Sequence, residues 1–192
     1  MGYMGAILEC GVSISRNLTC NHLLSSDRYN HAMEEHLRFT GFYHVFQIGI
    51  VQCQKGLVNA LVERWHPDTH TFHLPVGECA VTLEDVALIL GLPTNGIPVT
   101  GVTLSSHEAL EVECLHLFGV VPSKSDCRGS FIKLVWLRDL KECIQCIDED
   151  SIQRYVKCHI MLLFGTILFG DKSRVGVHWK FLPLLRDFGS IG

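Results

Sequence analysis

Three histidines stand close together in the chain and offer the chemistry of a metal site. His66, His70 and His73 carry imidazole nitrogens, which are common zinc ligands. Residues at this spacing would converge on a helix, but Pro67 excludes a helix here and the alternation that follows predicts a strand. On a strand His73 shares a face with Thr71, while His70 points the other way. We therefore favour a structural role over a metal site.

A second group of possible metal ligands lies further along the chain. Cys143 and Cys146 form a C-x-x-C pattern, and Cys158 with His159 follows at a distance that could complete a zinc site. The pattern falls in a segment predicted to be helical, where the first two thiols are one turn apart beside apolar residues. Zinc sites usually place such pairs on turns, and cysteine is often buried. We interpret these thiols as core residues.

A cysteine nucleophile is the third possibility. Cys79 with His73 as base and Asp85 as orienting group would outline a Cys/His hydrolase. Each residue also has a simpler role, because Cys79 fits an inward-facing strand position and Asp85 a helix cap. No oxyanion hole is indicated in this stretch, and no three acidic residues can be assigned to a two-metal nuclease centre. The sequence favours a non-catalytic chain without a cofactor.

Hydrophobic periodicity predicts the elements that position these residues. Helices are expected from Asp27 to about Thr40 and over Leu57–Trp65. Alternation predicts a strand over Thr69–Leu74, and the turn Pro75–Gly77 leads into a partner strand over Glu78–Val81. The sequence therefore predicts one small β-hairpin among helices.

A capped helix should follow the hairpin. The Thr82 hydroxyl can accept a hydrogen bond from the backbone N–H of Asp85, and Val81 and Val86 occupy the positions of a hydrophobic staple. Gly91 can take the left-handed conformation that ends a helix. Four apolar residues of this helix are expected to be buried: Val86, Leu88, Ile89 and Leu90.

The rest of the chain is predicted to be helical. Helices are expected from a capping residue at Ser105 to Gly119, across Phe131–Ile147, and from about Ser151 to Phe169, the last apolar nearly all round. Residues 1–25 are poorly specified. Residues 26–192 are interpreted as one mostly α, multi-helix globular domain with the small hairpin.

Composition narrows the class of protein. With 192 residues, 47% of them hydrophobic, the chain can bury a sizeable core. Its longest apolar run, residues 160–170, is shorter than the roughly 20 residues of a membrane span, and no basic region marks a secretory leader. Nine scattered cysteines fit free thiols in a reducing compartment. The net charge of −4, with no basic stripe, argues against tight direct DNA binding.

Several motifs together resemble a known family. The most specific are Glu63-Arg64-Trp65, Thr69 to Pro75, Gly77-Glu78-Cys79, Asp85-Val86-Ala87, Leu90 to Pro93 and Leu182 to Asp187. They resemble the plant mobile domain, the family of the MAINTENANCE OF MERISTEMS-like proteins and of related transposon-borne reading frames. The resemblance runs from about Gly41 to Asp187. His66 stands where the family usually carries arginine, and the family normally continues beyond Asp187, so we expect the domain to be incomplete at its C-terminus.

The resemblance implies a nuclear, chromatin-associated protein that acts in transposon silencing and meristem maintenance beside a phosphatase-like partner. Family members are also called aminotransferase-like, but no glycine-rich phosphate cradle and no lysine in an apolar setting suit that chemistry. Two alternatives stay open: a nucleic-acid-associated protein of transposon origin, and then the Cys/His hydrolase. The resemblance marks these residues for a possible interaction: Arg64, Trp65, His70, His73, Glu78, Cys79, Asp85, Arg186 and Asp187.

Two arginines in these motifs are candidates for ion pairs. Arg64 and Arg186 each lie beside a large apolar residue, where a guanidinium can bind a carboxylate through two parallel hydrogen bonds. The candidate partners are Glu63, Glu78, Glu84 and Asp187. A structural role is favoured over ligand binding for both arginines.

Overall fold

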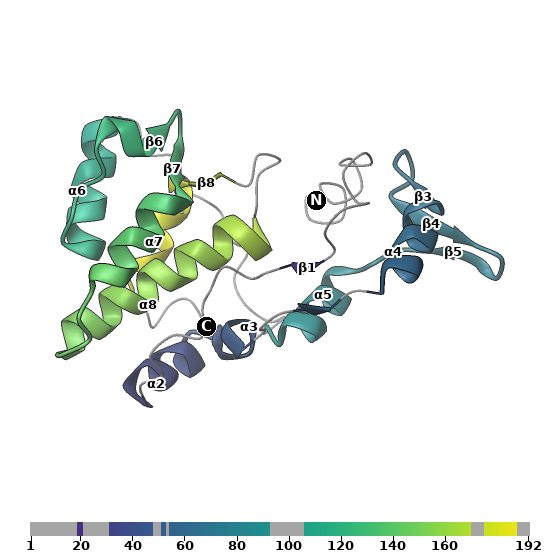
Figure 1. Ribbon diagram of the computed structural model, residues 1–192, viewed down its shortest axis with the longest axis horizontal. Helices are drawn as coiled ribbons and strands as arrows, with labels where there is room; N and C mark the ends of the chain where they lie inside the picture. The colour runs from purple at the N-terminus through teal and green to yellow at the C-terminus, as the bar shows by residue number, and fades with distance from the viewer. Residues whose placement is uncertain are drawn as a thin grey trace. The chain divides into compact units, whose positions relative to one another are not determined.

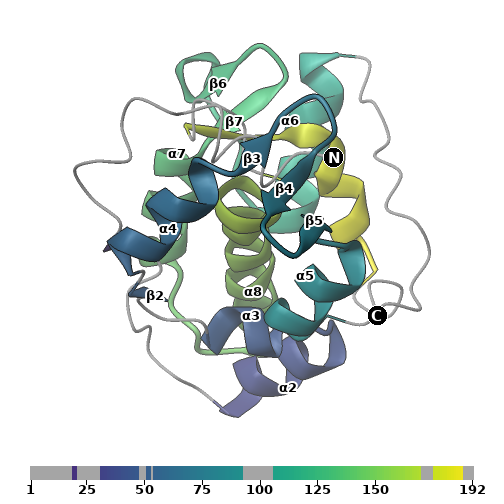
Figure 2. The same ribbon diagram turned by 90° about the vertical axis from the view of Figure 1, so that its right-hand side faces the viewer.

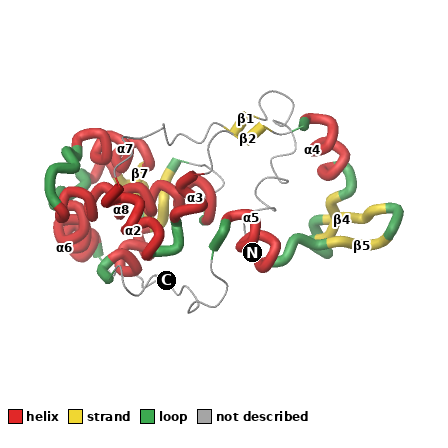
Figure 3. Tube along the Cα trace, turned by 90° about the horizontal axis from the view of Figure 1, so that it is seen from below, coloured by secondary structure: helices red, strands yellow, loops and turns green. Residues whose placement is uncertain are grey.

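The computed structural model describes residues 19–20, 31–47, 51–52, 54–92, 106–169 and 175–187. The chain divides into two compact units. Unit 1 comprises residues 1–27 and 44–94, and unit 2 comprises residues 28–43 and 95–192. Helices predominate over strands (Figure 3), which confirms the mostly α fold class.

Unit 1 contains short helices around a small antiparallel sheet. β1 (Thr19–Cys20) pairs with β2 (Val51–Gln52). The sheet has the order β3-β4-β5, and α4 and α5 precede and follow it (Figure 1). The bounds are α4 Lys55–Val62, β3 Trp65–His66, β4 Thr71–Leu74, β5 Gly77–Cys79 and α5 Leu83–Leu90.

The predicted hairpin is present as β4 and β5, and β3 adds a third strand. Trp65 was expected to lie on a helix, but α4 ends at Val62 and Trp65 pairs with Phe72 across β3 and β4. The helix cannot extend through His66, because the residue before Pro67 is biased towards extended conformations. The ring centroids of Trp65 and Phe72 lie 4.9 Å apart. Trp65 therefore anchors the sheet.

The predicted caps of α5 are confirmed. The Thr82 hydroxyl accepts from the backbone N–H of Asp85 at 3.1 Å, and Gly91 ends the helix in the left-handed region at a φ of 66°. However, the prediction that all four apolar residues of this helix are buried is wrong. Leu88 is 79% exposed and Ile89 is 73% exposed, while Val86 and Leu90 are half-buried. An eight-residue helix has room for only one buried stripe, and these two leucine and isoleucine side chains lie outside it.

Unit 2 holds the main core of the described residues. α8 (Glu149–Leu163) is buried on nearly all sides, as its composition predicted, and it runs beside α7 (Leu134–Cys143), as Figures 1 and 2 show. α2 (His31–Phe39) and α6 (His107–Phe118) also pack against α8. α3 (Tyr43–Gln47) follows α2 after a left-handed Gly41, and its residues from His44 onwards belong to unit 1.

A π-helical turn, η2 (Phe164–Leu168), prolongs α8 at its C-terminal end. A Cβ atom at Gly165 would lie 2.5 Å from Leu134 Cδ2 and 2.9 Å from Val177 Cβ. Only glycine therefore permits this approach. None of the described helices is both long enough and apolar enough to span a bilayer.

Unit 2 contains a second three-stranded sheet, which the sequence did not predict. Phe131–Lys133 was expected to begin a helix but forms β7, which pairs with β6 (Cys127–Arg128) and β8 (Gly176–His178). A turn with Gly129 in the left-handed region folds β6 onto β7 and so delays α7 by three residues. η1 (Lys124–Asp126) precedes β6, and η3 (Trp179–Leu185), a 3-10 helix, follows β8.

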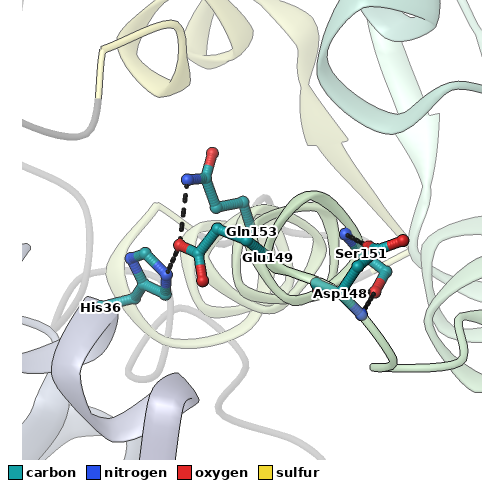
Figure 4. A network of polar contacts seen from close by, with 5 residues as sticks. All are labelled: His36, Asp148, Glu149, Ser151 and Gln153. Atoms are coloured by element: carbon teal, nitrogen blue, oxygen red, sulfur yellow. Dashed lines mark hydrogen bonds and ion pairs between the residues drawn. The ribbon is translucent and has the colours of Figure 1, made fainter.

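Polar contacts fix the first turn of α8 (Figure 4). The Asp148 carboxylate caps the helix by accepting from the backbone N–H of Ser151 at 2.8 Å. Glu149 Oε1 lies 2.7 Å from His36 Nε2 on α2 and accepts from Gln153 Nε2 at 3.3 Å. This network ties α2 to α8. The cap of α6 is Ser106, whose side chain accepts from the Ala109 N–H at 3.2 Å; the expected cap, Ser105, lies outside the described residues.

Candidate interaction surface

The register of the sheet in unit 1 sorts its side chains onto two faces. Trp65 pairs with Phe72 and Phe72 with Cys79, so these three share one face. His73 pairs with Glu78 and lies on the opposite face, because successive residues of a strand alternate. One face is therefore aromatic and the other is polar.

Two histidine rings lie on the polar face. The rings of His66 and His73 stack with centroids 3.7 Å apart and planes 13° apart. His73 Nε2 lies 3.5 Å from Glu78 Oε1. His70, at a φ of 55°, sits in the turn and directs its ring edge-on to Trp65, 6.1 Å away, so it does not join the other two. Among the described residues no three His, Cys, Asp or Glu side chains are grouped as metal ligands.

The suggested hydrolase residues do not meet. Cys79 and His73 are on opposite faces of the sheet, by the register given above. Cys79, on the edge strand β5, was expected to face inward but is exposed. The Asp85 carboxylate accepts from the Thr82 hydroxyl at 2.7 Å and from the Thr82 N–H at 2.8 Å, and these hydrogen bonds lower the pKa of Asp85. Asp85 is thus a helix cap.

The C-x-x-C pattern is not on one helix. α7 ends at Cys143, Ile144 is extended, and Cys146 lies in the connection to α8. Cys143 is exposed, which corrects its assignment to the core, whereas Cys158 is buried as expected. Burial raises the pKa of the Cys158 thiol, so this thiol is inert at neutral pH. Cys143 is therefore at the surface and Cys158 in the core, so the two thiols do not share one environment.

Unit 2 contains a buried basic pair that was not predicted from the sequence. Lys141 Nζ lies 3.1 Å from His159 Nδ1 and 5.0 Å from the centre of the Tyr155 ring. Burial, and then the charge of Lys141, hold the pKa of His159 well below its usual value. Burial likewise lowers the pKa of Lys157. The burial of Lys157 and His159 could have been predicted, because both lie in the part of α8 that is apolar nearly all round.

The two arginines do not pair with the expected carboxylates. Arg186 Nε donates to Glu113 Oε1 at 2.8 Å, and Arg186 Nη2 donates to Glu113 Oε2. This hydrogen bonding raises the pKa of Arg186. Glu113 is only 3% exposed, so the pair satisfies a buried carboxylate and ties η3 to α6. Asp187 follows as an exposed residue.

Arg64 has a backbone role instead. Its Nη1 donates to the Ala60 carbonyl at 2.9 Å, and its own carbonyl accepts from the His73 N–H at 2.8 Å. Arg64 thus joins the end of α4 to the central strand. Glu113 could have been found from its helical spacing, since Leu110, Cys114 and Leu117 on the same helix are all buried.

In the described part of unit 1, α5 has an exposed apolar face that the fold does not explain. On α5 the large side chains of Leu88 and Ile89 point away from the half-buried stripe formed by Val86, Ala87 and Leu90. Glu84 and Asp85 stand one turn before them, at i−4, on the same side. The face therefore combines two carboxylates with two apolar side chains. An exposed apolar patch rimmed by polar side chains is a feature of protein–protein interaction sites.

The positions of the cysteines predict the outcome of a metal assay. The purified chain should hold no stoichiometric zinc, and chelation with EDTA should leave its thermal unfolding unchanged, because Cys158 is buried in the core and Cys143 is at the surface. Elemental analysis and a thermal melt measure both. One zinc per chain, lost together with the fold on chelation, would restore the metal site.

Comparison with known proteins places the chain in a family. The family model described as plant mobile domain matches residues 41–192. In Arabidopsis thaliana, the serine/threonine-protein phosphatase 7 long form homolog is 40% identical over 183 residues, which cover 92% of this chain and 13% of that protein. Protein MAIN-LIKE 1 is 36% identical over 79% of this chain and 30% of its own length.

Protein MAINTENANCE OF MERISTEMS is 34% identical, again over 79% of this chain and 32% of its own length. The chain thus spans at most about a third of these curated relatives. No solved structure matches it. The family match covers both the signature segment around the sheet and the Arg186 motif, and the chain belongs to the plant mobile domain family.

Proposed function

We propose that this chain is a non-catalytic protein-interaction module of a nuclear MAINTENANCE OF MERISTEMS-like protein that acts in transposon silencing and meristem maintenance. The similarity to MAINTENANCE OF MERISTEMS over 79% of the chain carries the proposal. The structure supports an interaction role in two ways. The exposed face of α5 offers apolar contact area, and Cys79 and His73 lie on opposite faces of the sheet, which does not suit a nucleophile and its base.

The proposed partner is a phosphatase-like nuclear protein. The support is that a domain similar to 92% of this chain occurs in a protein named as a phosphatase 7 long form homolog. Domains joined in one protein often correspond to domains that associate as separate chains. The module would thus hold a phosphatase-like protein at the sites where the MAINTENANCE OF MERISTEMS-like protein works.

Capture from nuclear extract tests this function. A tagged full chain should retain a phosphatase-like protein, identified by mass spectrometry, at physiological salt. A chain denatured and bound to the same resin is the control for adhesion. If folded chain retains no phosphatase-like protein above this control, the proposed partner is wrong.

The cap of α5 should be important for presenting the module's surface. Thr82→Ala removes the acceptor for the Asp85 N–H, and loss of such a cap typically costs about 1 kcal/mol. Hydrogen exchange of the amides in residues 83–90 should rise accordingly. Thr69→Ala, at an exposed turn position, is the matched control and should change stability by less than about 0.5 kcal/mol. Equal exchange in the two variants would show that the cap does not hold the helix.

A DNA-binding assay separates the proposal from the transposon-derived alternative. We expect no tight duplex binding by the isolated chain at physiological salt, because 16 basic residues face 20 acidic ones and phosphate contacts need clustered Lys and Arg. An electrophoretic mobility shift at submicromolar protein that weakens steeply with salt would instead favour the nucleic-acid-associated role.

A further inference from the structure

We infer that the outward face of α5, formed by Glu84, Asp85, Leu88 and Ile89, binds an amphipathic helix of a partner protein whose apolar stripe is flanked by Lys and Arg. This inference rests on the proposed function, since it names the surface and the partner chemistry of the same module. The sequence motif around Asp85 explains the cap of the helix. It does not explain why two large apolar side chains face outward.

The face is a continuous strip on one side of the helix. Glu84 and Leu88 are four residues apart, as are Asp85 and Ile89, so each carboxylate lies one turn before an apolar side chain. Burying Leu88 and Ile89 against a partner would remove from water two side chains that the fold itself leaves in solvent. A partner helix is the element that such a strip fits best.

Both ends of α5 are fixed, so the strip does not have to be ordered on binding. The capping box between Thr82 and Asp85 holds the first turn. At the last turn Gly91 lies directly against α3, because a Cβ atom there would be 2.6 Å from the Cβ atom of His44. A helix held at both ends presents its side chains with little loss of entropy when a partner binds.

Charge selects the kind of partner. Residues 54–92 contain two basic residues, Lys55 and Arg64, and the latter is engaged with the Ala60 carbonyl. Five acidic residues stand in the same segment: Glu63, Asp68, Glu78, Glu84 and Asp85. The hydrogen bonds from Thr82 keep Asp85 ionised. A partner with Lys or Arg beside its apolar stripe would complement this charge, and one with acidic flanks would be repelled.

The same charges disfavour a second copy of this chain as the occupant. Two α5 helices packed antiparallel would place Glu84 and Asp85 of each beside the carbonyl end of the other, where the helix dipole is negative. Parallel packing would oppose carboxylates to carboxylates. Neither arrangement buries Leu88 and Ile89 without an electrostatic penalty, so a partner of opposite charge fits better.

Peptide display on the full chain tests the inference. A library of random 16-residue peptides is selected on immobilised wild-type chain, with removal of peptides that also bind Leu88→Ser/Ile89→Ser. The matched control is Val112→Ser/Leu115→Ser, which removes another exposed apolar pair, from α6 in unit 2. Because all four positions are exposed, both double variants should keep the wild-type circular dichroism spectrum and melting temperature.

Enriched peptides should carry apolar residues at i, i+3, i+4 and i+7 with Lys or Arg beside them. Their affinity, measured by fluorescence anisotropy, should fall at least about tenfold on Leu88→Ser/Ile89→Ser and on Glu84→Lys, and stay unchanged on the α6 control. The inference is overturned if no discriminating peptide is enriched, if the enriched peptides are acidic or neutral, or if sedimentation shows a wild-type dimer that Leu88→Ser/Ile89→Ser abolishes.

Failure of this inference is distinguishable from failure of the proposed function. If the phosphatase-like protein is captured equally by wild-type chain and by Leu88→Ser/Ile89→Ser, the module still has its partner and the α5 face is not the site. If wild-type chain captures no such protein, the proposed partner fails whatever peptides bind α5.

Discussion

Leu182→Ala is expected to lower the free energy of unfolding of unit 2 by about 2–5 kcal/mol, the range for a fully buried leucine. Leu182 lies in η3 and has no exposed surface, so the shorter side chain leaves a cavity in the core. Denaturant unfolding followed by tryptophan fluorescence in a Trp65→Phe background measures it. The two remaining tryptophans, Trp136 and Trp179, both belong to unit 2.

Leu115→Ala is the matched control, because Leu115 is 56% exposed in the same unit. It should change stability by less than about 0.5 kcal/mol. If Leu182→Ala behaved like this control, the segment around Leu182 would not be part of the core. The expected result would establish that the motif ending in Arg186 and Asp187 is a structural signature, because Arg186 also satisfies the buried Glu113.

Unit 2 should lose stability as the pH falls from about 6.5 towards 5. The pKa of His159 is depressed in the folded chain, so below its usual value the unfolded chain takes up a proton that the folded chain does not. The stabilisation from the neutral imidazole is complete above about pH 6.5 and is lost below it, with a slope of about 1.4 kcal/mol per pH unit for one proton. The capping carboxylates Asp85 and Asp148 have lowered pKa values, so their loss needs more acid pH, below about 4.

His159→Gln should make this pH dependence shallower by about one proton, since glutamine keeps an oxygen that can accept from Lys141 and does not titrate. Unfolding free energies at pH 5.0, 5.5, 6.0 and 6.5 in the Trp65→Phe background provide the slope. His116→Gln, at an exposed position of α6, should leave it unchanged. An unaltered slope in His159→Gln would mean that another group takes up the proton. His178, whose pKa is lowered mainly by burial, would then be the next to replace.

Local signals in the sequence were sufficient for the elements whose ends are set by neighbouring residues. The helix after the hairpin was predicted from Thr82, Asp85 and Gly91, which act within a few residues of one another. The central position of α8 followed from its apolar residues on every side. The hairpin followed from alternation around Gly77.

Contacts between distant segments were not accessible in this way. β7 reads as the start of a helix until β8 supplies its partner strand more than forty residues later. Arg186 pairs with Glu113 across 73 residues. Helical spacing indicates that Glu113 is buried, but no local pattern identifies Arg186 as its partner. The exposed face of α5 could be predicted only in part, for a different reason. Periodicity shows that α5 is apolar, but the available core decides which of its side chains remain in solvent.

The order of segments in the two units also bears on how the chain folds during synthesis. Unit 2 begins with residues 28–43 and resumes only at residue 95, so α2 is made long before the helix on which it packs. Glu149, the partner of His36, is synthesised 113 residues after it. At 5–20 residues per second that is roughly 6–23 s on the ribosome. During this interval the apolar side of α2, with Met33 and Leu37, has no native surface to cover it. A nascent chain therefore passes through a stage that chaperones would recognise.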